Sequence, residues 1–175
     1  MLDKIQLWLK SKIGQPWAYH ITCIIYIIIT FGGLAIIGWI FGVLWQSILI
    51  GVLISCLRFY TMGFHCSSNV RCFIISSILM VMFGTLTKIM PMWAIFLLCL
   101  YSCRDIYQKS PIELNSDFIG KDKDWHFKRS VLIMVLYLIA ALVLYYFGIY
   151  EVCKCIMLSL IMVDLMLFKN DKEYI

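Results

Sequence analysis

The sequence predicts an all-α, polytopic membrane protein with about six transmembrane helices and an N-terminal amphipathic helix at the membrane interface. The chain has 175 residues, of which 63% are hydrophobic and 14% are charged. Soluble domains are typically about 45–50% apolar and about 25% charged. The mean hydropathy is +0.91, and the apolar residues gather in runs that approach the roughly 20 residues needed to cross a bilayer. We therefore expect a single integral membrane domain over residues 1–175.

The expected elements follow from where the apolar runs begin and end. Residues 1–16 mix apolar residues with three lysines, which is typical of a surface amphipathic helix rather than of a cleavable signal peptide. A transmembrane bundle is expected over residues 17–168, with a first turn at Gly32 and Gly33, although Gly38 and Gly42 leave this boundary open. The predicted spans are residues 17–31, 34–57, 72–87, 90–103, 131–149 and 152–168, before a cytoplasmic tail at 169–175.

The basic residues predict the orientation of this bundle. With six spans, 13 of the 15 Lys and Arg residues fall on the side of the two termini, and only Lys88 and Lys154 fall on the other. Cytoplasmic loops of membrane proteins carry an excess of Lys and Arg. We therefore expect a multi-pass protein of the cell membrane, with both termini and the loops at 58–71 and 104–130 in the cytoplasm. A five-span alternative would separate the termini and weaken the asymmetry.

Several classes of protein and site are disfavoured. The eight cysteines are scattered through apolar runs and do not resemble a disulfide framework. The formal charge of +5 is modest, and no nucleic-acid partner is expected. The Cys153-Lys154-Cys155 segment has no nearby ligands to complete a tetrahedral metal site and falls in a predicted external turn. A zinc site at His65, Cys66 and Cys72 would take Cys56 as its fourth ligand, but Cys56 lies on the second predicted span, so we expect no metal ion and no cofactor.

Polar residues concentrate at 58–72 and 104–130, and the first segment offers a nucleophile and a base. If Asn69 caps the following helix, Cys72 lies in its first turn, where the helix dipole and Arg71 favour the thiolate. His65 is the candidate base. Seven residues along a straight helix would separate the two by about 10 Å, so we expect a turn, permitted by Gly63, to fold His65 back over the helix start. The alternative is that both are ordinary polar residues at the membrane interface.

These residues resemble the accessory gene regulator B (AgrB) family of membrane endopeptidases. In that family an Arg, a Gly, a His and a Cys recur with the spacing seen in Arg58, Gly63, His65 and Cys72, with seven positions from Arg to His and seven from His to Cys. Length and predicted topology also agree. The sequence departs from the family after the fourth span, where a Pro-rich segment is represented by Pro111 alone.

The resemblance implies a cysteine endopeptidase that removes the C-terminal tail of an AgrD-type precursor peptide. Cys72 would form an acyl-enzyme thioester, and His65 would act as base and then as acid. A Cys or Ser of the precursor would then close a thiolactone or lactone ring for quorum sensing. Arg58 would contact the oxyanion or a substrate carboxylate, or be an ordinary interfacial basic residue, and Gly63 would supply the turn.

Other roles stay open at the level of sequence. A backbone carbonyl, Asn69 or Asp105 could orient His65. The loop at 104–130 is either a solvated connector or a docking surface for a charged precursor tail. Its candidate substrate-binding residues are Lys121, Lys123, Lys128 and Arg129.

A non-enzymatic membrane transporter or assembly scaffold is the competing interpretation. A transporter would be expected to carry paired charges near the middle of the bilayer, whereas Asp164 has no obvious partner and structural pairing near the cytoplasmic face is the favoured role for it. The spacing of Gly38 and Gly42 permits close helix approach and suggests a homodimer. The lipid bilayer itself is the expected partner of the N-terminal helix.

Overall fold

The computed structural model describes residues 31–61, 69–110 and 123–167, and their regular structure is entirely α-helical. The side chains of residues 69–73 and 123 are not part of this description. The N-terminal amphipathic helix predicted at 1–16, nearly all of the first span and the tail at 169–175 lie outside the described residues. The helices are Phe31–Ile40, α3 (Leu44–Thr61), α4 (Asn69–Ile89), α5 (Met92–Lys109), α7 (Lys123–Tyr146) and α8 (Tyr150–Met166).

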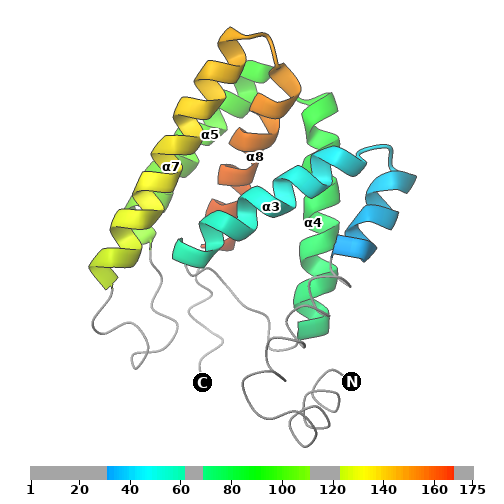
Figure 1. Cartoon of the computed structure of the whole chain (residues 1–175), viewed down its shortest axis with the longest axis horizontal. Coiled ribbons are helices and arrows are strands. Elements are labelled where there is room, and N and C mark those ends of the chain that lie inside the picture. Colours follow the sequence, from blue (N-terminus) through cyan, green and yellow to red (C-terminus); the bar gives the residue numbers. More distant parts are fainter. Residues whose placement is uncertain (1–30, 62–68, 111–122, 168–175) are drawn as a thin grey trace, which may run out of the picture.

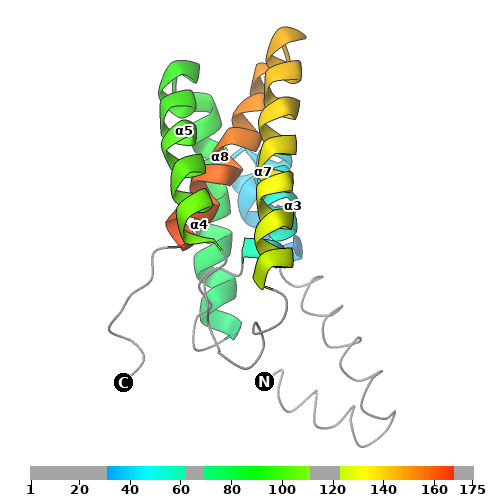
Figure 2. The same ribbon diagram turned by 90° about the vertical axis from the view of Figure 1, so that its left-hand side faces the viewer.

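Helix α8 forms the centre of the bundle. It packs against α3, α4, α5 and α7, and Figure 2 shows it between α5 and α7. Cys153 and every residue from Cys155 to Asp164 are buried. A helix that is apolar on all sides is buried either in a protein core or in a membrane, and other helices cover α8 here. The other four labelled helices are therefore arranged around α8.

The first predicted turn is in the wrong place. Gly32 and Gly33 lie inside the helix Phe31–Ile40, and the chain turns instead around Gly42, which has φ of +65°. Glycine within a helix costs only about 1 kcal/mol, so tertiary packing can override it. A left-handed turn residue, in contrast, strongly favours glycine. Gly148, with φ of +76°, ends α7 in the same way.

The two glycines proposed for a dimer do not share a helix face. The helix ends at Ile40, which leaves Gly42 in the turn. Gly38 is buried against its own chain, since a Cβ there would lie 3.2 Å from Leu44 Cα. The two glycines therefore do not form one close-packing face, and the homodimer stays a prediction. A closer helix approach occurs where α4 meets α3, because a Cβ at Gly84 would lie 2.7 Å from Ser47 Oγ.

The connection predicted at 104–130 is shorter than expected. Helix α5 continues to Lys109 and α7 already begins at Lys123, so polar residues at both ends extend helices rather than forming a loop. The helix propensity of Lys, Arg and Gln accounts for these extensions.

The outer surface of the bundle is apolar. Two described helices are long and apolar enough to cross a membrane, Leu44–Thr61 and Asp124–Tyr146, whereas Phe31–Ile40 and Ile74–Ile89 are shorter apolar helices. Many large hydrophobic side chains point outward. Examples are Trp39, Ile75, Leu97, Leu136 and Tyr146. Contiguous apolar surface of this kind marks contact with a membrane or another protein. Six spans remain a prediction.

The helices alternate in direction, which separates the basic residues of the described chain. Arg58, Arg104, Lys109, Lys128 and Arg129 lie at or near one end of their helices, called here the basic end, where α3, α5 and α8 finish and α4 and α7 begin. Lys88 and Lys154 lie at the opposite end. The partition inferred from the sequence is thus reproduced by helix direction.

The two lysines of the opposite end bind backbone carbonyls. Lys154 Nζ donates to Thr87 O at 3.0 Å and to Met90 O at 2.9 Å, and Lys88 Nζ donates to Gly42 O at 2.6 Å. The last carbonyls of a helix have no partner within it, and a cation there also complements the helix dipole. Lys154 thereby joins α8 to the turn between α4 and α5.

Replacing Lys154 by Met should destabilise the bundle by about 2 kcal/mol, because hydrogen bonds to a charged group contribute about 1.5–3 kcal/mol. Thermal unfolding in detergent micelles, followed by circular dichroism, measures the change. The matched control is Lys128→Met, an exposed lysine at the basic end, which should change stability by no more than about 0.5 kcal/mol. Equal effects of the two substitutions would contradict the role of Lys154.

Candidate functional site

The start of α4 places the backbone of Cys72 in the first turn of a helix. Helix α3 ends at Thr61 and α4 begins at Asn69, so Gly63 and His65 belong to the connection between them. That connection and the side chain of Cys72 lie outside the described residues. The positive end of the α4 dipole favours an anion in this turn. The backbone position therefore suits a thiolate, as the sequence predicts, while the fold-back of His65 remains a prediction.

Arg58 lies in the last turn of α3, at the same end of the bundle as the start of α4. Its side chain is partly buried. A cation in the last turn of a helix is favoured by the dipole, so the position of Arg58 has a structural explanation as well as the functional one. Both interpretations given above remain compatible with this position.

An aromatic cluster joins the end of α3 to the start of α7. Tyr60 lies 5.6 Å from Trp125 and 6.4 Å from His126, measured between ring centroids. The guanidinium of Arg129 lies 5.5 Å from the centre of the Trp125 ring, within the range of a cation–π contact. None of Tyr60, Trp125 and His126 is among the site residues predicted above from the sequence. The feature of the sequence that could have pointed to them is the presence of Trp125 and His126 among the charged residues at 121–129.

The structure places the predicted substrate-binding residues on a helix rather than in a loop. Lys123 is the first residue of α7, and Lys128 and Arg129 lie exposed within its first two turns. Lys121 falls outside the described residues. Basic residues near a helix N-terminus are disfavoured by the dipole. Stabilisation of α7 by its dipole therefore does not explain these cations.

A second polar group is buried where α5 faces α8. The side chain of Asp164 on α8 lies beside Ser102 of α5 and in the electrostatic field of Asp105 and Lys109, and its Oδ1 has no hydrogen-bond partner among the described residues. Ser102, Asp105 and Asp164 are each more than nine-tenths buried. Asp164 is thus held by polar neighbours, and the structural role favoured by the sequence has a partner in Ser102. Ser102, Asp105, Lys109 and Asp164 are called the polar cluster below.

Asp105 already has a partner in the structure. Its Oδ2 accepts a hydrogen bond from Lys109 Nζ one turn later in α5. This hydrogen bond is the main reason that the pKa of Lys109 lies above the ordinary lysine value. To orient His65 as the candidate base, Asp105 would have to share its carboxylate between Lys109 and His65. The orienting role of Asp105, like that of Asn69, stays a prediction.

The Cys153-Lys154-Cys155 segment is not an external turn. Cys153 and Cys155 are buried in the first turns of α8, and Cys153 Sγ lies 3.1 Å from Ala141 O. The apolar character of both thiols fits the centre of the bundle. Within the described parts of the chain, no group of three or more His, Cys, Asp or Glu residues could hold a metal ion.

Comparison with protein-family models decides the family to which this chain belongs. A family model described as accessory gene regulator B matches residues 2–168, nearly the whole chain. The chain belongs to the AgrB family. Neither curated proteins nor solved structures give a match. Membership of the AgrB family connects this protein with the agr quorum-sensing system and, together with its two long apolar helices, with the membrane.

In this AgrB protein, Asp105→Asn should lower the pKa of Lys109 towards its ordinary value. Acylation of Lys109 at about pH 9.5 by an amine-reactive ester, followed by mass spectrometry, should therefore become faster, since only the neutral amine reacts. A pKa raised by folding stabilises the folded state below the unfolded lysine value of about 10.4. That contribution is lost as the pH rises through the folded pKa. The rate at Lys128 is the internal control, and an unchanged rate at Lys109 would contradict the pairing.

Proposed function

We propose that this protein is a membrane-embedded cysteine endopeptidase that cuts the C-terminal tail from an AgrD-type precursor and supports its cyclisation. The observation that carries the proposal is the position of Cys72 in the first turn of α4 in a chain that matches the AgrB family over 2–168. One His and one Cys form a weak motif by themselves. The helix start at Cys72 and the match to the AgrB family are the two observations that support a peptidase role for them.

The first step forms a thioester. His65 takes the proton of the Cys72 thiol, and the thiolate attacks a backbone carbonyl carbon near the C-terminal end of the precursor. Collapse of the tetrahedral intermediate breaks the C–N bond. His65 returns the proton to the leaving amine, and the tail departs with a free amino group. The precursor remains attached to Cys72 Sγ.

The second step closes the ring. A Cys or Ser side chain within the precursor loses its proton to His65 and attacks the thioester carbonyl. The bond between the acyl carbon and Cys72 Sγ breaks, His65 returns the proton to the sulfur, and a thiolactone or lactone leaves. Exchange of one thioester for another has little energetic cost, whereas attack by water would release a linear acid. A site at the membrane interface, with restricted water, favours the ring.

We place the basic end in the cytoplasm, with six spans and both termini on that side of the cell membrane. Support comes from the alternating helix directions and from the separation of Lys88 and Lys154 from the other basic residues of the described chain. This placement puts Cys72 and His65 on the cytoplasmic side, where the precursor is made.

The start of α7 is the proposed docking site for the charged tail of the precursor. Lys128 and Arg129 are exposed there, and Lys121 and Lys123 add positive charge nearby in sequence. Carboxylates are bound well by such cations, and charge complementarity acts mainly on the association rate. Arg58 would contact the oxyanion or a substrate carboxylate, and Gly63 would permit the turn before His65.

Cys72→Ala and His65→Ala should each abolish tail release in liposomes that contain the purified protein and a precursor peptide, as measured by mass spectrometry. The wild type should also give a mass adduct of the precursor minus its tail on the peptide that contains Cys72. Cys56→Ala is the matched control, because Cys56 is an exposed free thiol of α3 and should retain full activity. Cleavage by Cys72→Ala would refute the peptidase proposal and favour a transporter or scaffold.

The double substitution Lys128→Gln and Arg129→Gln should raise KM about 10-fold or more at low salt and leave kcat within about 2-fold, because rim charges steer association rather than chemistry. Steady-state cleavage at two ionic strengths measures this. The difference from wild type should shrink at high salt, since exposed charges are then screened. A loss of kcat at unchanged KM would place these cations in the chemical step instead.

A further inference from the structure

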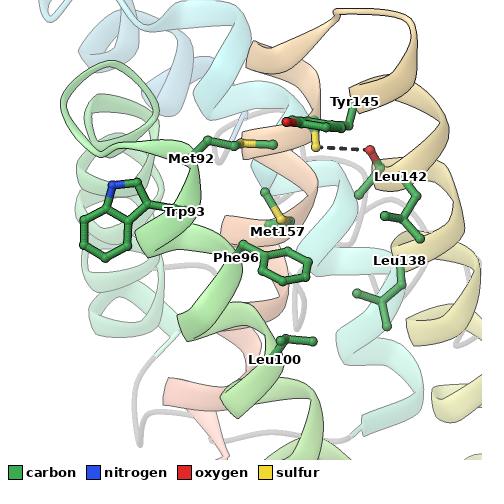
Figure 3. Close-up of a pocket in the computed structure, with 10 residues that line it drawn as sticks. Met92, Trp93, Phe96, Leu100, Leu138, Leu142, Tyr145 and Met157 are labelled. Atoms are coloured by element: carbon green, nitrogen blue, oxygen red, sulfur yellow. Dashed lines mark hydrogen bonds between the residues drawn. The ribbon is translucent and has the colours of Figure 1, made fainter.

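A cavity of about 660 Å³ opens on the side of the bundle, between α5 and α7. Its volume falls within the range of about 300–1,000 Å³ that is typical of ligand sites. Figure 3 shows Phe96 of α5, Leu138 and Leu142 of α7 and Met157 of α8 converging on it, with Tyr145 across one end. This cavity takes no part in the chemistry proposed above, and we call it the lateral groove.

The lateral groove has exposed walls and a buried floor. Phe96 and Leu142 are 44% and 62% exposed, so the walls open to the surroundings of the bundle. The floor is α8, where Met157 is only 3% exposed and Cys153 only 1%. Because α5 and α7 both pack on α8, the space between them is bounded by helices on three sides.

Water is a poor occupant of this groove. A buried water normally needs two to four polar partners, and cavities with apolar linings stay dry. The lining is almost entirely Met, Leu and aromatic side chains. The thiol of Cys153 already lies in hydrogen-bond contact with Ala141 O at 3.1 Å. The groove therefore requires an apolar occupant.

A thin occupant suits the groove better than a helix. An α-helix with its side chains is about 10–12 Å across, whereas the floor of the groove is nearly closed, with Met157 3% exposed. A single extended alkyl chain is much thinner. The lining runs from Met92 to Leu100 on α5, or about 12 Å at 1.5 Å per residue. This length is less than half of the roughly 30 Å hydrocarbon core, which matches the depth of one leaflet.

The position of the groove selects the leaflet. Its residues belong to the first half of α5 and the second half of α7, which lie away from the basic end. Tyr145 and Tyr150 pack edge to face beside it, with ring centroids 5.5 Å apart. Aromatic residues of this type are enriched where a protein meets lipid headgroups. We propose that the lateral groove binds one acyl chain of a phospholipid from the leaflet opposite the basic end. The inference rests on the membrane placement proposed above, and not on the peptidase chemistry.

Photolabelling in nanodiscs tests this site. The probe is a phosphatidylcholine with a diazirine near the end of one acyl chain, diluted into phosphatidylcholine and phosphatidylglycerol. Irradiation and peptide mapping should place label on Met157, which lies on the floor of the groove and which a chain meets only by entering the space between α5 and α7. A diazirine near the headgroup should instead label Tyr145. Label confined to outward-facing residues such as Leu97 would overturn the proposal.

Matched substitutions separate the groove from the general lipid surface. Leu142→Trp should fill the groove and remove the label from Met157, whereas Leu136→Trp, at a 52% exposed position of α7 outside the lining, should keep it. Leu138→Phe provides a second, milder filling variant, and circular dichroism confirms that each variant is folded. Met157 labelling that survives both filling variants overturns the proposal. So does a chemical cross-link from the groove to another copy or another segment of the chain.

The Cys72→Ala variant should show the same labelling as the wild type. A wild-type protein that shows no tail cleavage but normal labelling at Met157 contradicts the peptidase proposal alone. A wild-type protein that cleaves the tail but shows no label at Met157 contradicts the lateral-groove proposal alone. The two proposals therefore fail independently.

Discussion

The arrangement of the bundle depends on the enclosure of α8 by four other helices. From Cys155 to Asp164 this helix has no exposed residue, so α3, α4, α5 and α7 must each present a surface to it. In a bilayer, apolar side chains gain little by leaving lipid, and close packing and a few polar contacts decide which helices associate. The contact of Gly84 with Ser47 is an example, since it brings α4 against α3 at a distance that no larger residue allows without movement.

Polar contacts to α8 differ between its two ends. At the opposite end, Lys154 binds the carbonyls where α4 finishes and thereby satisfies groups that the helix itself leaves open. Near the basic end, Asp164 meets Ser102 and the field of Asp105 and Lys109. A buried carboxylate is tolerated only where hydrogen bonds and opposite charge offset the loss of solvation. The polar cluster lies between α5 and α8 on the side of the bundle where Cys72 lies.

This division suits the proposed chemistry. A Cys–His peptidase needs a thiolate, a base within hydrogen-bond reach and a bound substrate, and it gains from restricted water. The start of α4 offers a favourable field for the thiolate, and the start of α7 offers exposed cations for an acidic segment. The lateral groove lies towards the other leaflet, so a bound acyl chain there would contact α5 and α7 without competing for the precursor.

The sequence by itself determined the helical class, the apolar exterior, the separation of basic residues and the helix start next to Cys72. These features depend on composition and on the period of the apolar residues, which are properties of short segments. It misplaced the turn at Gly32 and Gly33, and it treated Gly38 and Gly42 as one helix face. Only packing decides which of several glycines takes a positive φ, because a glycine inside a helix is a small penalty that neighbouring contacts can offset.

Tertiary structure also decided which distant residues meet. The pairing of Ser102 with Asp164, the aromatic cluster of Tyr60 with Trp125, and the binding of Lys154 to the end of α4 each join segments far apart in the chain. The lateral groove likewise exists only because α5 and α7 rest on a common floor. Periodicity shows that a helix has an apolar face, but it carries no information about which helix will cover that face. That choice is made by the fit of side chains across the whole bundle.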